Sequence, residues 1–362
     1  MSRVVGNDTE HKLLALLRIA LNCSAEAAND KQIFSLDAED WRNILDLAAA
    51  HTVTGLIYAA VKKLPSDLCP PDEISLKLMM EAERIERYSR KVAAFTEKLV
   101  SELKGASLAP VFMKGHEVAK YYPEPYLRVC GDIDIYFQPS EFQMAVSFFK
   151  EKGYAPQRRP DHSFFSNSGP GIDIHPYYFD LHVRLEKLPP VPSTEAVLLM
   201  LSSHILKHAM GPGVGLRQIC DMVVCLKAFT GNSAESNCTY DSVKLEEYFQ
   251  AAHVATWNKV LLAFISRYFG LDTAMFSGSV NAGQPLPKKI RKLLSSFERI
   301  VFSGGNFGFY NISRKKTATS KFSGKRKIDT FYRFLRNTPF SLRCSPREFF
   351  SYTFSLLKGN LD

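Results

Sequence analysis

Hydrophobic positions recur at helical spacing over the first hundred residues and again beyond Pro192. Side chains three and four positions apart lie on one face of a helix, so this spacing predicts amphipathic helices. We expect these helices over 11–21, 37–63, 72–103, 194–210, 216–229, 243–269 and 286–302.

Between these two parts the spacing changes to alternation. Residues 129–137 place Asp132, Asp134 and Tyr136 on one face and apolar side chains on the other, which indicates a strand packed on a core. Further strands are expected over 109–113, 162–166 and 172–185, the last interrupted near Pro176, with helices over 116–122 and 141–152. We therefore predict an α+β fold with a small mixed-sheet core over 106–190, an N-terminal helical segment over 1–105 and a larger helical domain over 191–362.

The composition indicates a globular protein and bears on where in the cell it is expected. Hydrophobic residues make up 46% of the 362 residues, with 26 Phe and 15 Tyr to fill the cores. Seven scattered Cys without a Cys-x-x-Cys pair predict reduced thiols rather than disulfides or a zinc site. No run approaches the roughly 18 apolar residues of a membrane span, and the N-terminus lacks a signal-peptide core. We expect a cytoplasmic protein without a membrane span.

The net charge of +9 is concentrated near the C-terminus. Residues 314–347 carry eleven Lys or Arg against one acid, so the rest of the chain has a net charge of −1. The part over 314–327 is also rich in Ser and Thr, which favours a mobile loop. Such a segment is usually solvated, but it could also contact nucleic acid, a phosphorylated partner or lipid headgroups.

The pair Asp132 and Asp134 is the strongest chemical feature. Two carboxylates two residues apart on a strand point the same way, roughly 7 Å apart along the backbone, and their oxygens can converge on a hard divalent cation. Phosphoryl and nucleotidyl transfer need such a cation to neutralise the triphosphate. On its own, an Asp-x-Asp pair is more often two solvated side chains.

The surroundings of this pair hold further motifs: Phe112-Met113-Lys114-Gly115, Ala119-Lys120-Tyr121-Tyr122-Pro123, Leu127-Arg128, Gly131-Asp132-Ile133-Asp134-Ile135, Phe179-Asp180-Leu181-His182-Val183-Arg184-Leu185 and Leu216-Arg217-Gln218-Ile219-Cys220-Asp221. Together these motifs resemble a known family, the uncharacterised nucleotidyltransferases of the DNA polymerase beta-like superfamily. The helix around Trp41 and the run Gly304-Gly305-Asn306-Phe307-Gly308 also fit, so the resemblance covers most of the chain.

The resemblance implies a nucleotide site with Mg²⁺ or Mn²⁺ as cofactor and an NTP, with ATP expected, as substrate. Asp132, Asp134 and Asp180 are then the catalytic and metal-binding carboxylates, and the turn at Lys114-Gly115 receives the triphosphate. Asp173 is the reserve for the third carboxylate, because Ile172-Asp173-Ile174-His175 and Phe179-Asp180-Leu181-His182 are near copies. Arg128, four residues before Asp132, either reaches a phosphate or is solvated.

Two further pairs have helical i,i+4 spacing. His204 and His208 share a helix face, but no Glu base accompanies them as in a metalloprotease motif, so a structural or pocket-wall role is favoured. Arg217 and Asp221 are expected to form an ion pair on a helix surface or between domains.

The sequence thus predicts a metal-dependent nucleotidyltransferase that moves a nucleoside monophosphate from an NTP to an unidentified acceptor, favoured to be a small molecule or a protein hydroxyl. A non-catalytic nucleotide-binding or interaction module of the same fold is the first alternative. An RNA-directed enzyme is the second, and nucleic acid is a less favoured partner.

Overall fold

The structure is a computed structural model in which residues 8–23, 36–158, 163–166, 169–182, 188–211, 213–230, 240–273, 276, 285–305 and 323–357 are described. The elements are α1 (Asp8–Ala20), α3 (Ala38–Ala50), α4 (Thr54–Val61), α5 (Asp72–Gly105), β1 (Val111–Met113), α6 (Lys114–Ala119), β2 (Ile133–Tyr136), α7 (Pro139–Glu151), β3 (Ala155–Arg158), β4 (Ser163–Ser166), β5 (Ile172–His175), α8 (Thr194–Met210), α9 (Leu216–Phe229), α10 (Ser242–Ala251), α11 (Ala255–Phe269), α12 (Lys288–Gly304), α14 (Ser323–Cys344) and α15 (Pro346–Leu357). Short 3₁₀ turns lie at Ser66–Leu68 and Pro125–Leu127. The predicted α+β class is confirmed.

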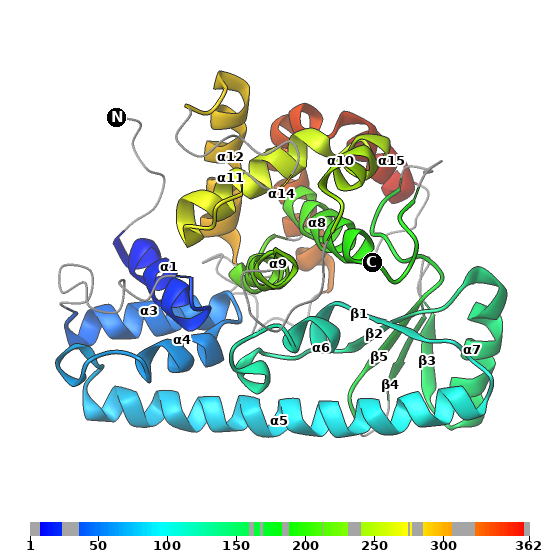
Figure 1. The fold of residues 1–362 in the computed structure, drawn as a ribbon, viewed down its shortest axis with the longest axis horizontal. Coiled ribbons are helices and arrows are strands. Elements are labelled where there is room, and N and C mark those ends of the chain that lie inside the picture. The colour runs from blue at the N-terminus through cyan, green and yellow to red at the C-terminus, as the bar shows by residue number, and fades with distance from the viewer. Residues whose placement is uncertain are drawn as a thin grey trace.

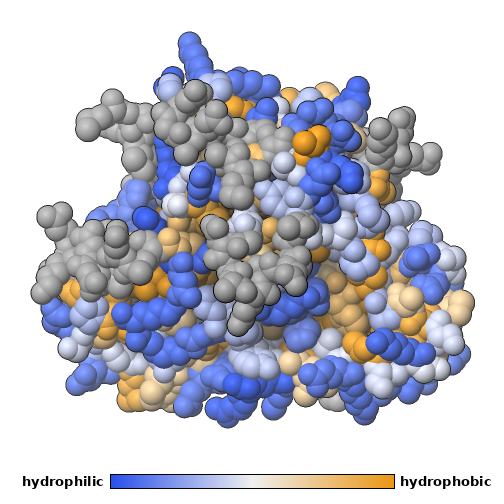
Figure 2. Space-filling model, viewed as in Figure 1, coloured by the Kyte–Doolittle hydropathy of each residue, from blue (hydrophilic) through white to orange (hydrophobic). Residues whose placement is uncertain are grey.

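Helix α5 connects the two ends of the molecule. Its 34 residues give a length of about 51 Å, and it runs along the lower edge of Figure 1, from beneath α3 and α4 to beneath the sheet. Its buried side chains follow helical spacing, and Val92, Leu99 and Leu103 belong to the core under the sheet. The outer surface along this edge is mostly hydrophilic, with apolar patches (Figure 2).

Two helices predicted as single are each broken in two. The stretch 37–63 forms α3 and α4, and the stretch 243–269 forms α10 and α11. Thr52 and His253 lie at the breaks, and both have a φ of 56°, a left-handed conformation that an α-helix does not continue. The single-helix predictions are therefore wrong at both places. Periodicity does not reveal these breaks, because hydrophobic residues recur at helical spacing on both sides of each turn.

The five-stranded sheet has the order β1-β2-β5-β4-β3, and among the described strands β2 and β5 are the one parallel pair. Strand β3 was not expected, and the strand predicted over 172–185 ends at His175, because the backbone from 176 to 182 leaves the sheet. The isoleucines of β2 and β5 pack with α5 and α7 in one core. This packing turns the opposite face of both strands toward α6 and the C-terminal helices.

The C-terminal helices share their core with the N-terminal ones. One hydrophobic cluster includes Leu13 of α1, Trp41 of α3, Leu206 of α8 and Trp257 of α11. This core extends across both predicted boundaries, at 105 and at 190. The three-part division of the chain stays a prediction. Helices α14 and α15 lie beyond the last predicted helix. Most of the stretch 314–327, predicted as a mobile loop, lies outside the described residues, but from Ser323 onward it is helical. In the part of the chain that the structure describes, no helix is long and apolar enough to cross a membrane.

His51 makes the stability of the fold dependent on pH. Its ring is fully buried, and Nδ1 accepts a hydrogen bond from the backbone N–H of Leu216, the first residue of α9, at 3.2 Å. Burial lowers the pKa of His51 to about 4. The unfolded chain therefore takes up a proton on His51 near pH 6.5, while the folded protein does not. The stability that comes from keeping His51 neutral is thus fully present above pH 6.5 and is lost as the pH falls toward 4.

We expect His51 to account for a loss of about 2–4 kcal/mol in the free energy of unfolding between pH 6.5 and pH 4. Urea unfolding of the native protein and of His51→Gln at several pH values measures this loss. The variant should show a shallower decline over this window, and parallel curves for the two proteins would refute the assignment.

Candidate active site

Asp134 lies in the middle of the sheet. In β2 it pairs with Met113 of β1 on one side and with Asp173 of β5 on the other. Its side chain is 14% exposed. Asp132 immediately precedes the strand and is exposed. Since alternate residues of an extended chain share a face, both carboxylates lie on the side of the sheet opposite the buried Ile133.

The third carboxylate of the site is Asp173, which lies beside Asp134 on the neighbouring strand. We expected Asp180 to approach from a neighbouring strand, but the neighbouring strand is β5, and its register sets Asp173 directly beside Asp134. Asp180 follows β5 in a segment without strand structure. The placement of Asp180 on a strand is therefore wrong. The two near copies of the motif have no local difference that decides which of them pairs with β2.

Lys114 contacts both Asp134 and Asp180. Its ammonium group lies 3.5 Å from an Asp134 oxygen and 3.1 Å from an Asp180 oxygen. Lys114 has a φ of 49°, a region that favours glycine, so the turn after β1 holds it in a strained backbone conformation. Beside it, a Cβ added to Gly115 would lie 3.7 Å from the Asp132 carbonyl oxygen and 3.9 Å from Arg128 Nη1. The predicted phosphate turn therefore lies against the carboxylate pair.

Asp180 contacts two side chains of α8. Its Oδ2 is 2.7 Å from His204 Nδ1, and its Oδ1 is 3.4 Å from Lys207 Nζ. His204 and Lys207 are three residues apart on α8, so both reach the same carboxylate. The His204 ring lies 4.5 Å, between centroids, from that of His208, whose Nδ1 is 3.3 Å from the Gly213 carbonyl oxygen. Asp180 and His204 thus form a carboxylate–imidazole pair beside the sheet acids.

The charges around the site shift the pKa values of its acids in different directions. Burial alone would raise the pKa of Asp134 and of Asp180, but the Lys114 ammonium, with His175 for Asp134 and with Lys207 and His204 for Asp180, holds both well below their usual range. For Asp132, partial desolvation by the surrounding protein and the charge of Asp134 raise the pKa. Asp134 and Asp180 are therefore charged near neutral pH.

Three side chains could hold a metal ion. Oxygen atoms of Asp134 and Asp173 and a ring nitrogen of His175 all lie within 4.8 Å of one another. His175 Nε2 is 3.1 Å from Asp134 Oδ1 and 3.5 Å from Asp173 Oδ2. Two carboxylates suit Mg²⁺ and Mn²⁺, and an added imidazole is better tolerated by Mn²⁺. The donor set therefore fits a divalent cation.

Arg128 is buried rather than solvated, and its contact with a phosphate stays a prediction. Its guanidinium donates to both oxygens of Asp221, from Nε at 2.8 Å and from Nη2 at 2.7 Å, and Tyr122 donates its hydroxyl to the same carboxylate at 2.7 Å. Arg217 donates to the Val129 carbonyl oxygen instead. The expected Arg217–Asp221 pair is therefore wrong, because Arg128 from another segment takes the acid.

Sequence reasoning missed His175 and Lys207 as members of this site. His175 stands in the quoted motif with Asp173, so its alternation on a strand offered a signal. Lys207 follows His204 by three residues, but its role depends on Asp180, which is far away in the sequence. Only the fold brings these residues together.

One of the comparisons with known proteins gave a match. The family described as uncharacterised nucleotidyltransferase matches residues 37–252. This range holds Trp41 and all the carboxylates of the site, and it ends before the run at 304–308. Comparison with curated proteins and with solved structures gave no match.

Proposed function

Because the chain belongs to the uncharacterised nucleotidyltransferase family, we propose that it transfers a nucleoside monophosphate from an NTP to a hydroxyl acceptor at the carboxylate site. The observation that carries the proposal is the juxtaposition of Asp134 and Asp173 on parallel neighbouring strands with His175. ATP is the expected donor, and the cytoplasm is the expected location. A small molecule or a protein hydroxyl is the expected acceptor.

Asp134 and Asp173, with His175, would hold the divalent cation, and Asp132 lies at the exposed end of the same face. A bound Mg²⁺ or Mn²⁺ supplies charge neutralisation to the triphosphate. Lys114 and Gly115 lie next to this face, so Lys114 supplies a further positive charge where the phosphates bind. Arg128 instead supports the segment before β2 through Asp221.

Asp180 and His204 are suited to activating the acceptor. Asp180 fixes His204 through Nδ1, which leaves Nε2 to take a proton. In the proposed step the acceptor oxygen attacks the α-phosphorus and loses its proton to His204 Nε2. The bond from the α-phosphorus to the bridging oxygen breaks, and pyrophosphate leaves.

We expect His204→Gln to lower transfer by about 10²–10⁴-fold while binding of ATP changes by no more than about twofold. The assay is pyrophosphate release from ATP with a panel of sugars, polyols and Ser- or Thr-containing peptides, alongside thermal shift with Mg²⁺ and ATP. His11→Gln, on the exposed face of α1, is the control. Loss of ATP binding in His204→Gln would assign this histidine to nucleotide binding instead.

A non-catalytic nucleotide-binding module is the second candidate, and one observation favours it. Lys114 already neutralises Asp134 and Asp180, as a cation would. A thermal shift with Mg²⁺ and ATP, combined with no pyrophosphate release for any acceptor in the panel, would select this candidate.

A further inference from the structure

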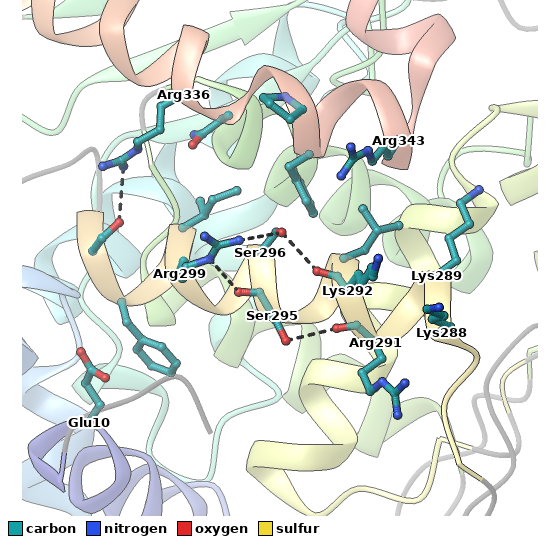
Figure 3. A pocket seen from close by; sticks show the side chains of 17 residues that line it. Glu10, Lys288, Lys289, Arg291, Lys292, Ser295, Ser296, Arg299, Arg336 and Arg343 are labelled. Carbon is teal, nitrogen blue, oxygen red and sulfur yellow. Dashed lines mark hydrogen bonds between the residues drawn. The ribbon is translucent and has the colours of Figure 1, made fainter. Parts of the chain in front are cut away.

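A basic groove runs between α12 and α14, apart from the carboxylate site. It has a volume of about 1290 Å³, and Figure 3 shows its cationic side chains along α12 and on the facing side of α14. Two of its cations, Arg336 and Arg343, come from α14. Five come from α12: Lys288, Lys289, Arg291, Lys292 and Arg299. Among the described residues that line the groove, Glu10 is the one acid.

No acid among the described residues neutralises these cations. None of the seven forms an ion pair with another residue in the described part of the chain, whereas Lys77, Arg84 and Arg90 on α5 are each paired with a glutamate one turn away. A second hollow of about 610 Å³ shares Lys289 and Arg343 with the groove and adds Arg347. The positive surface therefore continues past the end of the groove.

The shape and spacing of the groove fit an extended polyanion. From Lys288 to Arg299 the helix rises roughly 16 Å. A single strand with stacked bases advances about 3.4 Å per phosphate, as one strand of a duplex does, so about five of its phosphates can follow α12. Ser295 and Ser296 lie between the cations, as Figure 3 shows, and add hydroxyl groups along the same line.

The apolar residues of the groove argue against a lipid surface. Leu293, Phe302 and Phe340 line it at 3%, 6% and 5% exposure, so these large apolar side chains form a covered floor and cannot insert into a bilayer. Among the apolar residues of the lining, Pro339 is the exposed one. The exposed residues of α12 from Lys288 onward are Lys, Arg and Ser. An exposed aromatic side chain lies nearby: Tyr332 is 66% exposed and precedes Arg336 by one helical turn on α14.

We propose that this groove binds single-stranded nucleic acid, with the cations on the phosphates and Tyr332 stacking on a base. Aromatic side chains beside a positive track are what single-strand binders use in addition to charge. The groove also contacts α8, the helix that carries His204, since Asn337 in its wall donates to the Ala209 carbonyl oxygen. Nucleic acid was the less favoured partner from the sequence, where the segment 314–327 was its main support.

The test is fluorescence anisotropy of a labelled 15-nucleotide RNA in EDTA without nucleotide, so the result does not depend on transfer activity. Neutralising about five phosphates gives a log–log salt slope near −3.5, so affinity should fall at least 100-fold between about 50 and 200 mM salt. Lys289→Glu/Lys292→Glu should weaken binding at least tenfold and reduce the slope by about 1.4. The matched control is Lys91→Glu/Lys104→Glu, two exposed lysines of α5 on the opposite side of Figure 1.

Tyr332→Ala distinguishes nucleic acid from other polyanions. It should weaken RNA binding about 5- to 160-fold, since stacking contributes roughly 1–3 kcal/mol per base, and should leave heparin binding within twofold. No RNA binding at low salt, or equal weakening by the α5 control, would overturn the proposal. Tighter binding to anionic lipid vesicles than to RNA, lost in Lys289→Glu/Lys292→Glu, would overturn it in favour of a membrane surface.

Discussion

Replacing Arg128 by methionine should lower the free energy of unfolding by about 3–5 kcal/mol, because it leaves the Asp221 carboxylate buried without its cation. Arg128 and Asp221 have side chains 4% and 5% exposed, joined by two hydrogen bonds. Tyr122 is the remaining donor to the acid, and a neutral hydroxyl does not offset a buried charge. Urea unfolding at pH 7 measures the change.

The double variant Arg128→Met/Asp221→Asn is the control for this prediction. It removes both charges, so it should recover part of the loss, and a double-mutant cycle then gives the coupling of the pair. A single variant that costs less than about 1 kcal/mol would show that Arg128 is not held by Asp221 in solution. The guanidinium would then be available for phosphate, as the sequence allowed.

Asp134→Asn should lower nucleotidyl transfer at least about 1000-fold, or about 4 kcal/mol in the activation barrier. Asp134 contacts both Lys114 and His175, so in the proposed function its charge acts on both the cation site and the turn that receives the triphosphate. Pyrophosphate release from ATP with the acceptor panel measures the loss. Asp46→Asn, an exposed acid on α3, should retain full activity, and an Asp134→Asn protein that keeps more than a tenth of the native rate would exclude Asp134 from the chemistry.

Much of the fold follows from periodicity alone. Helices α8 and α9 begin and end at the predicted residues. Ser193 and Gly215 are their N-cap residues, and apolar residues recur at helical spacing after each of them. Strand β2 follows from the alternation around Ile133. The breaks at Thr52 and His253 do not, since neither residue is a glycine that would indicate a positive φ in the sequence.

The site was less predictable than the fold because it depends on strand register. Local sequence identifies Asp132 and Asp134, but the pairing of β2 with β5 decides that Asp173 is the adjacent acid. A one-residue slip would have turned Asp173 to the other face. The basic groove could not be predicted from the sequence for a related reason. Lys289 and Arg336 are far apart in the sequence, and the net charge of a segment does not show that the cations of α12 share one face.

The identity of the acid beside Asp134 leads to the most direct test. Mn²⁺ binding followed by electron paramagnetic resonance, with and without ATP, compares the native protein with Asp173→Asn and Asp180→Asn. If Asp134, Asp173 and His175 hold the cation, Asp173→Asn should weaken Mn²⁺ binding at least tenfold and Asp180→Asn should change it by no more than about threefold. Mn²⁺ binding that survives in Asp173→Asn but is lost in Asp180→Asn would contradict the proposed site.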